Sequence, residues 1–271
     1  MPHANRSAET SPQPPAESTP LLAVQGSVAT ITLNRPSQRN SLHDEDLRRL
    51  LGYFTQLNAD ASVHVVVLTA QTAGQPKPVF SAGYHVGGFE QSGHDPRLFE
   101  QVPDALERLR PLTLCALNGS VYGGATDLLL ACDLRIGLAG SEFRMPAAAL
   151  GLHYYPSGLG RYVSRLGLNL AKRAFLSAQA IPCGQLQQVG LFEQLVDAQG
   201  FDAAVSDWVQ RLSSLAPLAA QATKQSLNEI AAGRFDEPSL RAREDLTAQS
   251  HDFAEGRAAF RERRVAKFEG R

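Results

Sequence analysis

The chain has 271 residues, of which 43% are hydrophobic and 20% are charged, and its formal net charge at pH 7 is −1. This profile is that of an ordinary globular protein with one or two domains. Because a net charge so near zero supplies no bulk field for nucleic acid or for a membrane surface, we expect neither as a partner. The three cysteines are scattered and odd in number, which predicts neither a disulfide framework nor a metal site and fits the cytoplasm.

The first seventy residues predict a loose tail and then two strands around one helix. Residues 1–20 are rich in Pro, Ser, Ala and Glu without apolar periodicity, so we expect a disordered tail there. The alternation in SVATITLN (27–34) predicts a strand. Apolar residues recur at i, i+3, i+4 and i+7 within 41–60, which predicts an amphipathic helix. The run VHVVVLTA (63–70) is typical of a strand that is buried on both faces.

The rest of the chain indicates an α/β fold with a helical end. Residues 113–119 and 132–139 read as strands on either side of a helix that begins near Gly123. Beyond about residue 155, helical patterns follow one another with almost no strand signal. We therefore predict an α/β core over 21–205 and a helical C-terminal region over 206–271.

Two glycine-containing loops are the candidate site. Gly123 and Gly124 leave backbone amides bare, and a helix that starts there adds unpaired N–H groups and a partial positive charge. Asp127 falls in the first turn of that helix. Upstream, Ala82 and Gly83 in VFSAGYHVGGF form a second turn after an apolar strand. If each loop points one N–H at the same oxygen, the pair is an oxyanion hole, which stabilises the negative charge that develops on a carbonyl.

Several other functions are excluded by spacing. No GxGxxG opens a helix after the first strand and no GxxxxGK[ST] is present, so neither a dinucleotide site nor a P-loop is predicted. No GxSxG elbow of a serine hydrolase occurs.

At this point the motifs resemble those of a known family. In chain order they are ITLNRPSQRNSL, FSAGYHVGGF, LNGSVYGGATDLLLACDLRI, FRMPAAALGL, LSAQAIPCGQLQQVGLFEQLV, LAPLAAQATKQSL and EGRAAFRERRVAKFEG. From about residue 22 to its last residue, the chain resembles the crotonase superfamily, the enoyl-CoA hydratase/isomerase group. The resemblance implies a coenzyme A thioester as substrate, without a separate cofactor, and the N–H groups of Ala82 and Gly124 as the oxyanion hole. It also implies a spiral of ββα units whose helical C-terminal region builds a homotrimer or a dimer of trimers.

The sequence departs from the hydratases of this group at one of two catalytic carboxylates. The resemblance places one glutamate three residues after the second glycine of the hole, where this chain has Asp127, and a second in the segment around MPAAALGL, where it has Ala147. Because a methyl group transfers no proton, the carboxylate pair that positions water is incomplete. Three alternatives stay open: an isomerase or slow hydratase that uses Asp127, a decarboxylase resembling methylmalonyl-CoA decarboxylase, and a non-catalytic acyl-CoA-binding protein.

Further candidate residues surround these motifs. Tyr84 and His85 follow the first loop and are expected to line the acyl pocket, with His85 a possible proton donor near neutral pH. Tyr154 lies in HYYPSG, where the decarboxylases of the group carry a tyrosine. Arg39, together with Lys267 and Phe268 near the C-terminus, resembles the family's contacts to the coenzyme A nucleotide, with the last two reaching a neighbouring subunit.

Overall fold

The fold is seen in a computed structural model that describes residues 16–85, 87 and 95–271. Most of the tail expected over 1–20, and part of the first glycine motif, lie outside the described residues.

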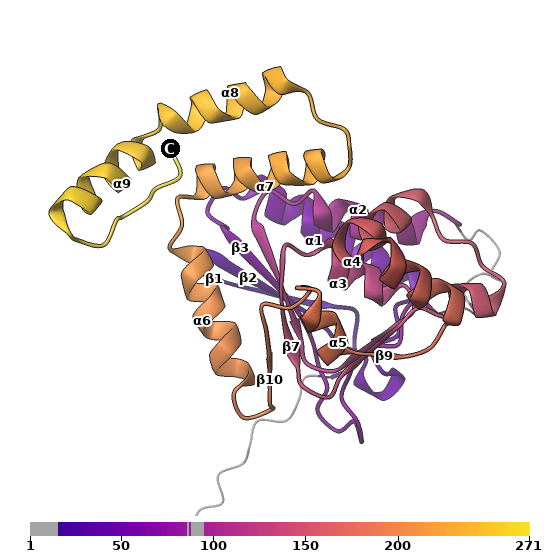
Figure 1. The fold of residues 1–271 in the computed structure, drawn as a ribbon. Helices are drawn as coiled ribbons and strands as arrows, with labels where there is room; N and C mark the ends of the chain where they lie inside the picture. The colour runs from indigo at the N-terminus through magenta and orange to yellow at the C-terminus, as the bar shows by residue number, and fades with distance from the viewer. Residues whose placement is uncertain (1–15, 86, 88–94) are drawn as a thin grey trace, which may run out of the picture.

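Two sheets form the centre of the molecule (Figure 1). The larger has six strands in the order β1-β2-β3-β5-β7-β10, and all its pairs are parallel except β1 with β2. The smaller has four strands in the order β4-β6-β8-β9, with only β9 antiparallel. The strands are β1 Leu21–Gln25, β2 Val28–Leu33, β3 Val65–Ala70, β4 Val79–Ser81, β5 Leu112–Leu117, β6 Ser120–Tyr122, β7 Leu134–Leu138, β8 Glu142–Arg144, β9 Ile181–Pro182 and β10 Gln194–Val196.

Helices cover both faces of the larger sheet, which explains the continuous apolar run of β3. Successive strand residues point to opposite faces. Val66 and Leu68 accordingly join the main core with α1, α2, α3 and α4, whereas Val65 and Val67 join a second cluster with α6. These helices are α1 Asp44–Ala59, α2 Leu98–Glu107, α3 Ala125–Ala131, α4 Pro156–Ser177 and α6 Phe201–Ser213, and the short α5 spans Cys183–Gln188. The predicted strands at 27–34 and 63–70 and the helix within 41–60 are confirmed.

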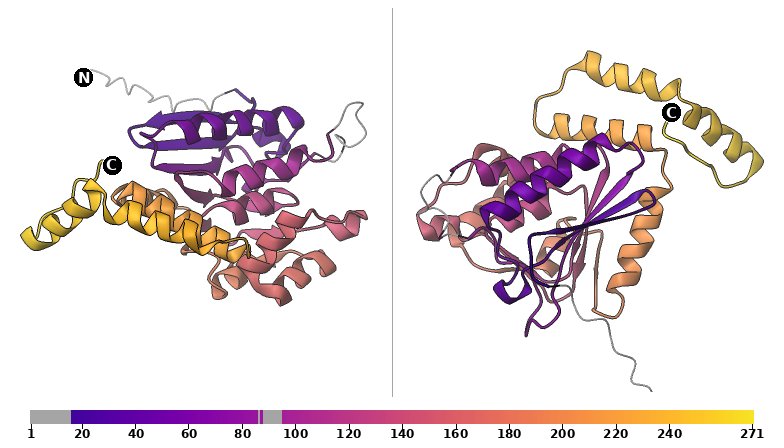
Figure 2. Two further views of the ribbon diagram at one scale, coloured as in Figure 1. Left: turned by 90° about the horizontal axis from the view of Figure 1, so that it is seen from above. Right: turned by 180° about the vertical axis from the view of Figure 1, so that it is seen from behind.

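The last three helices form an arm that extends from the body of the molecule (Figures 1 and 2). They are α7 Pro217–Ala231, α8 Glu237–Ala248 and α9 His251–Glu262. The α7 helix is attached by the buried Lys224, whose ammonium donates to the Pro111 carbonyl and pairs with Asp133, both at 2.7 Å. The boundary expected at residue 205 falls inside α6, and because α6 packs on the sheet, the core extends through residue 213.

The α/β fold with a helical C-terminal region is thus observed, and so is the short apolar strand expected before Ala82, which is β4. The sequence did not predict β1 or the helix α2, nor the strands β6, β8 and β10, which have three residues each, too few for a period to be recognised. Within the described ranges, no helix is long and apolar enough to cross a membrane.

Candidate active site

The first glycine loop is held by hydrogen bonds to the segment before α1. The buried Ser81 donates its hydroxyl to the Asn40 carbonyl at 2.7 Å and accepts from the Gly83 N–H at 3.1 Å. Leu42 N–H donates to the Gly83 carbonyl, and His85 N–H donates to the Leu42 carbonyl, both at 2.9 Å. These bonds fix the direction of each peptide group in the loop.

The second glycine loop packs directly against the first. Gly83 and Gly123 have φ angles of 91° and 55°, in the left-handed region that favours glycine. A Cβ atom placed on Gly83 would lie 2.6 Å from the Tyr122 carbonyl and 3.1 Å from the Gly124 nitrogen, so any side chain there would separate the loops. Gly124 caps α3 as predicted, and no acceptor for its backbone N–H exists in the described part of the chain. The N–H of Gly124 is thus a donor held ready beside the first loop.

The other expected donor, Ala82, requires a correction. Its N–H donates to the Arg39 carbonyl at 2.8 Å and is turned toward the segment before α1. The neighbouring peptide group between Gly83 and Tyr84 is different, because its carbonyl accepts from Leu42. In a trans peptide the N–H points opposite to the C=O, and the described chain contains no cis bonds, so the Tyr84 N–H points away from Leu42.

A cavity of about 610 Å³ opens beside both loops. It is mostly apolar, and it brings together Ala82, Tyr84, His85, Gly124, Ala147 and Tyr154 from the predicted set. The other lining residues are Ser41, Pro96, Phe99, Glu100, Gly123, Met145, Pro146, Leu150, Leu152, His153, Tyr155 and Pro156. Gly83 is not among the lining residues. At position 147, where the family resemblance implies a second carboxylate, the cavity wall has only the methyl group of Ala147.

Asp127 is not among the residues that line this cavity, and the expectation that it faces the acyl chain has to be revised. Its side chain is 0% exposed, and its two carboxylate oxygens accept from the Arg161 guanidinium at 2.9 and 2.8 Å. The Tyr155 hydroxyl donates to the same carboxylate. Burial disfavours the charged guanidinium, but the hydrogen bonds and charge of Asp127 outweigh it and raise the pKa of Arg161. Asp127 is thus bound by the side chains of Tyr155 and Arg161.

Arg161 is the residue of this arrangement that sequence reasoning missed. Its side chain is 3% exposed, and it also contacts Asp104 at 2.9 Å and Glu107 at 3.1 Å on α2. The arginine lies 34 positions from Asp127 and belongs to no spacing motif. Only the packing of α4 against α2 and α3 brings these groups together.

Two tyrosines that line the cavity are linked to Asp127 by hydrogen bonds. The Tyr154 hydroxyl donates to the Tyr155 hydroxyl at 3.1 Å, and Tyr155 donates in turn to Asp127. Burial, followed by the negative charge of Asp127, raises the pKa of both phenols above the ordinary value. Their rings pack on Gly158, where a Cβ atom would lie 2.4 Å from the Tyr154 ring. The cavity wall therefore presents neutral phenols rather than carboxylates at this point.

The side chains of Tyr84 and His85, which follow the first glycine loop, contact residues at the start of α1. The Tyr84 hydroxyl donates to Asp44 at 2.6 Å, and burial together with this bond raises the pKa of Tyr84. The His85 ring stacks on His43 with centroids 4.6 Å apart. Burial and the nearby His85 lower the pKa of His43. Of these residues, His85 and Tyr84 line the cavity and His43 lies behind them.

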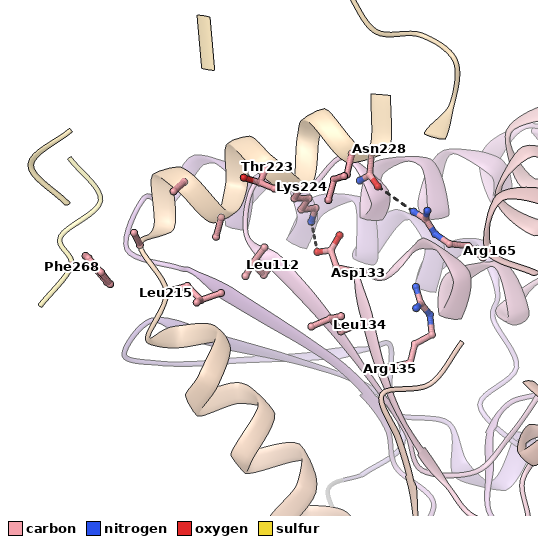
Figure 3. A pocket seen from close by; sticks show the side chains of 14 residues that line it. Leu112, Asp133, Leu134, Arg135, Arg165, Leu215, Thr223, Lys224, Asn228 and Phe268 are labelled. Atoms are coloured by element: carbon pink, nitrogen blue, oxygen red, sulfur yellow. Dashed lines mark hydrogen bonds and ion pairs between the residues drawn. The ribbon is translucent and has the colours of Figure 1, made fainter. Parts of the chain in front are cut away.

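The residues expected to contact coenzyme A are divided between two places. Arg39 is exposed beside the first loop, which its carbonyl helps to hold. Lys267 and Phe268 follow α9, and the Lys267 N–H donates to Glu255 at 2.8 Å. Phe268 lines a different cavity, of about 720 Å³, between α7 and the ends of β5 and β7 (Figure 3). Within one chain, the structure does not bring Lys267 and Phe268 to the glycine loops.

Comparisons with known proteins identify the family. The sequence model described as enoyl-CoA hydratase/isomerase matches residues 23–271. A 2,3-dehydroadipyl-CoA hydratase of Escherichia coli (strain K12) is 30% identical over 263 residues, covering 93% of this chain and 98% of that protein. A short-chain-enoyl-CoA hydratase of Clostridium acetobutylicum is 27% identical, covering 77% of this chain and 80% of the relative.

Solved structures show the same fold. The crystal structure of a putative enoyl-CoA hydratase/isomerase family protein from Hyphomonas neptunium superposes with a TM-score of 0.84 at 26% identity, covering 94% of this chain and 98% of the other. With the fold, the two glycine loops and the family match over nearly the whole described length, the chain belongs to the enoyl-CoA hydratase/isomerase enzyme family of the crotonase superfamily.

Proposed function

We propose that this enzyme binds an acyl-CoA thioester with its carbonyl oxygen at the Gly124 N–H and stabilises the enolate that forms there. The Tyr84 N–H lies on the other side of that oxygen in this proposal, replacing the Ala82 N–H expected from the sequence. The observation that carries the proposal is the close packing of Gly83 on Gly124 beside an apolar cavity. Donors that are fixed in place before the reaction stabilise a developing oxyanion without the cost of reorganisation.

The chemistry of the acyl group is proposed to be of the hydratase/isomerase type, in which a carbon of the acyl chain exchanges a proton with the site. We assign that exchange to an imidazole of the cavity wall, His85 or His153, which takes the proton from the acyl carbon as the enolate forms and then returns it. Tyr155 and Tyr154 line the same cavity as a hydrogen-bonded pair of hydroxyls. Asp127 and Arg161 are positioning residues in this scheme, because they act through the Tyr155 hydroxyl. The raised pKa of Tyr155 keeps its phenol protonated, with the O–H directed at Asp127.

A second reaction, decarboxylation of a malonyl-type CoA ester, is favoured by one specific observation. Neither Asp127, which is bound to Arg161, nor Ala147 offers a carboxylate to the cavity. Loss of CO2 breaks the carbon–carbon bond and leaves its electron pair as the enolate, so no base is needed. A proton from water then completes the product.

The decisive experiment measures the enolate directly. We expect the enzyme to catalyse exchange of the α-hydrogens of a saturated acyl-CoA for deuterium in D2O, and to bind that ester more tightly than the S-alkyl CoA thioether, which lacks the carbonyl oxygen. Parallel incubation with crotonyl-CoA and with methylmalonyl-CoA, followed by enone absorbance and by CO2 release, separates the two reactions. Equal affinity for ester and thioether, with no α-exchange, would rule out the proposed oxyanion site and leave the non-catalytic alternative.

We further propose that the arm formed by α7, α8 and α9 assembles subunits into a homotrimer or a dimer of trimers. The arm carries many exposed large apolar side chains, and such patches mark protein contact surfaces. They are Leu227, Ile230, Phe235, Leu246, Phe253 and Phe260. In that assembly Lys267 and Phe268 serve the nucleotide of a neighbouring subunit's coenzyme A. Light scattering with Phe260→Asp as the test variant checks the assembly, and a wild-type protein that is monomeric at micromolar concentration would contradict it.

The compartment proposed for this chemistry is the cytoplasm. The free cysteines Cys115, Cys132 and Cys183 are buried, which is compatible with a reducing environment.

A further inference from the structure

One end of the acyl cavity carries a carboxylate that no other group neutralises within the described residues. Glu100 of α2 is half-buried and lines the cavity, and it also borders a second cavity of about 590 Å³ together with Pro156. Glu100 and Pro156 thus lie where the two cavities adjoin, and neither glycine loop lines the second cavity. The described part of the chain shows no hydrogen bond or ion pair to the Glu100 side chain.

Two arginines that line the second cavity are already engaged by other groups. Arg161 is surrounded by Asp104, Glu107 and Asp127 at 2.8–3.1 Å. Arg165 lies 3.6 Å from Glu107 and donates to Asn228 at 3.1 Å. Both arginines line the second cavity but not the acyl cavity, as does Arg234. Because Glu100, Asp104 and Glu107 repeat at i, i+4 and i+7, they also share one face of α2.

The acyl cavity itself holds no lysine or arginine among its described lining residues. Its apolar lining residues include Phe99, Leu150, Leu152 and Met145. Residues 86 and 88–94 lie outside the described part, and their sequence contains neither lysine nor arginine. A carboxylate that enters an apolar cavity without a cationic partner loses its hydration without compensation. A second carboxylate nearby adds repulsion.

We infer that the enzyme selects acyl groups whose far end is uncharged, and that Glu100 is the specificity-determining residue that rejects a terminal carboxylate. This inference rests on the proposed function, since it presumes that the acyl chain lies in this cavity. It sets the chain apart from the Escherichia coli relative, a 2,3-dehydroadipyl-CoA hydratase, whose named acyl group ends in a carboxylate.

The test compares two esters of equal chain length, hex-2-enoyl-CoA and 2,3-dehydroadipyl-CoA, at pH 8, where an ordinary imidazole is uncharged. We expect kcat/KM to favour the neutral ester at least about tenfold, which corresponds to about 1.4 kcal/mol. Glu100→Gln should reduce the ratio of the two kcat/KM values by raising kcat/KM for 2,3-dehydroadipyl-CoA, and Glu100→Lys should reduce that ratio further. Glu193→Gln is the matched control, because Glu193 is exposed and lies outside the cavity lining.

A binding measurement separates failure of this inference from failure of the proposed function. The dissociation constants of the saturated esters hexanoyl-CoA and adipyl-CoA are measured for the wild type and for Glu100→Gln. If neither ester binds, the acyl-CoA site itself is refuted. If both bind equally to the wild type, or if Glu100→Gln leaves their ratio unchanged, the site stands and the assignment of Glu100 is overturned.

Discussion

The substitution Arg161→Met tests whether Asp127 is a positioning residue held by a buried ion pair. Arg161 is 3% exposed and Asp127 is 0% exposed, and the guanidinium donates to both carboxylate oxygens. Asp104 and Glu107 are about one-fifth exposed and regain water when Arg161 is removed, whereas Asp127 does not. Removing one partner of a buried pair costs about 3–5 kcal/mol. We expect the free energy of unfolding to fall by that amount.

The assay is urea unfolding at fixed protein concentration, with Arg173→Met as the control. Arg173 is exposed on the same helix, so its replacement should change stability by less than about 0.5 kcal/mol. Asp127→Asn alone should cost about 1.5–3 kcal/mol, the worth of hydrogen bonds to a charged group. In the double variant the buried charge disappears with its partner, so the loss should be smaller than for Arg161→Met alone. Additive losses, or a loss below 1 kcal/mol in Arg161→Met, would refute the buried pair.

Three further predictions concern the cavity. Burial and the carboxylate of Asp127 raise the pKa of Tyr155, so its phenol stays protonated past the ordinary pKa near 10, and the pH–rate profile should show no falling limb between pH 8 and 10. A falling limb in that range that disappears in Tyr155→Phe would contradict this prediction. In Gly124→Ala the new methyl group would lie 2.5 Å from the Phe99 ring, so the affinity for acyl-CoA should drop at least about tenfold. The control is Gly52→Ala, whose Cβ meets nothing within 4 Å; it should bind acyl-CoA normally in the same titration and gain about 0.5–1 kcal/mol of stability. Ala147→Glu restores a carboxylate to the cavity wall and should raise crotonyl-CoA hydration at least about tenfold, and an unchanged rate in the enone absorbance assay would show that a carboxylate at this position cannot supply the missing proton transfer.

The parts of the fold that could be predicted are those where one periodicity dominates. The apolar run of β3 is continuous because its two faces pack against two different hydrophobic clusters, and this run is directly visible in the amino-acid sequence. The α1 helix is similar, since Leu47, Leu50 and Phe54 fall on one buried face. The three-residue strands β6, β8 and β10 could not be predicted, because each forms only by pairing with a strand far along the chain, as β10 does with β7.

The candidate site was predicted in position but not in orientation. Gly124 and Asp127 lie on α3 as their spacing indicates. The direction of the Ala82 N–H, however, depends on the carbonyl of Arg39, which sits in a left-handed turn with φ of 53° that no pattern in the sequence marks. The direction of Asp127 depends on Arg161, which reaches it only after α4 has packed. Contacts of this kind are set by tertiary packing rather than by spacing.

In the proposed function, the side chains at positions 127 and 147 are physically connected. The cavity wall has the Ala147 methyl group where the family resemblance implies a second carboxylate, so no pair of carboxylates is present to position water. Burying the shorter Asp127 against Arg161 converts it into a fixed acceptor, and that acceptor orients the Tyr155 hydroxyl that lines the cavity. In this proposal, the cavity wall therefore presents a phenol fixed by the buried Asp127 where the resemblance implies a carboxylate.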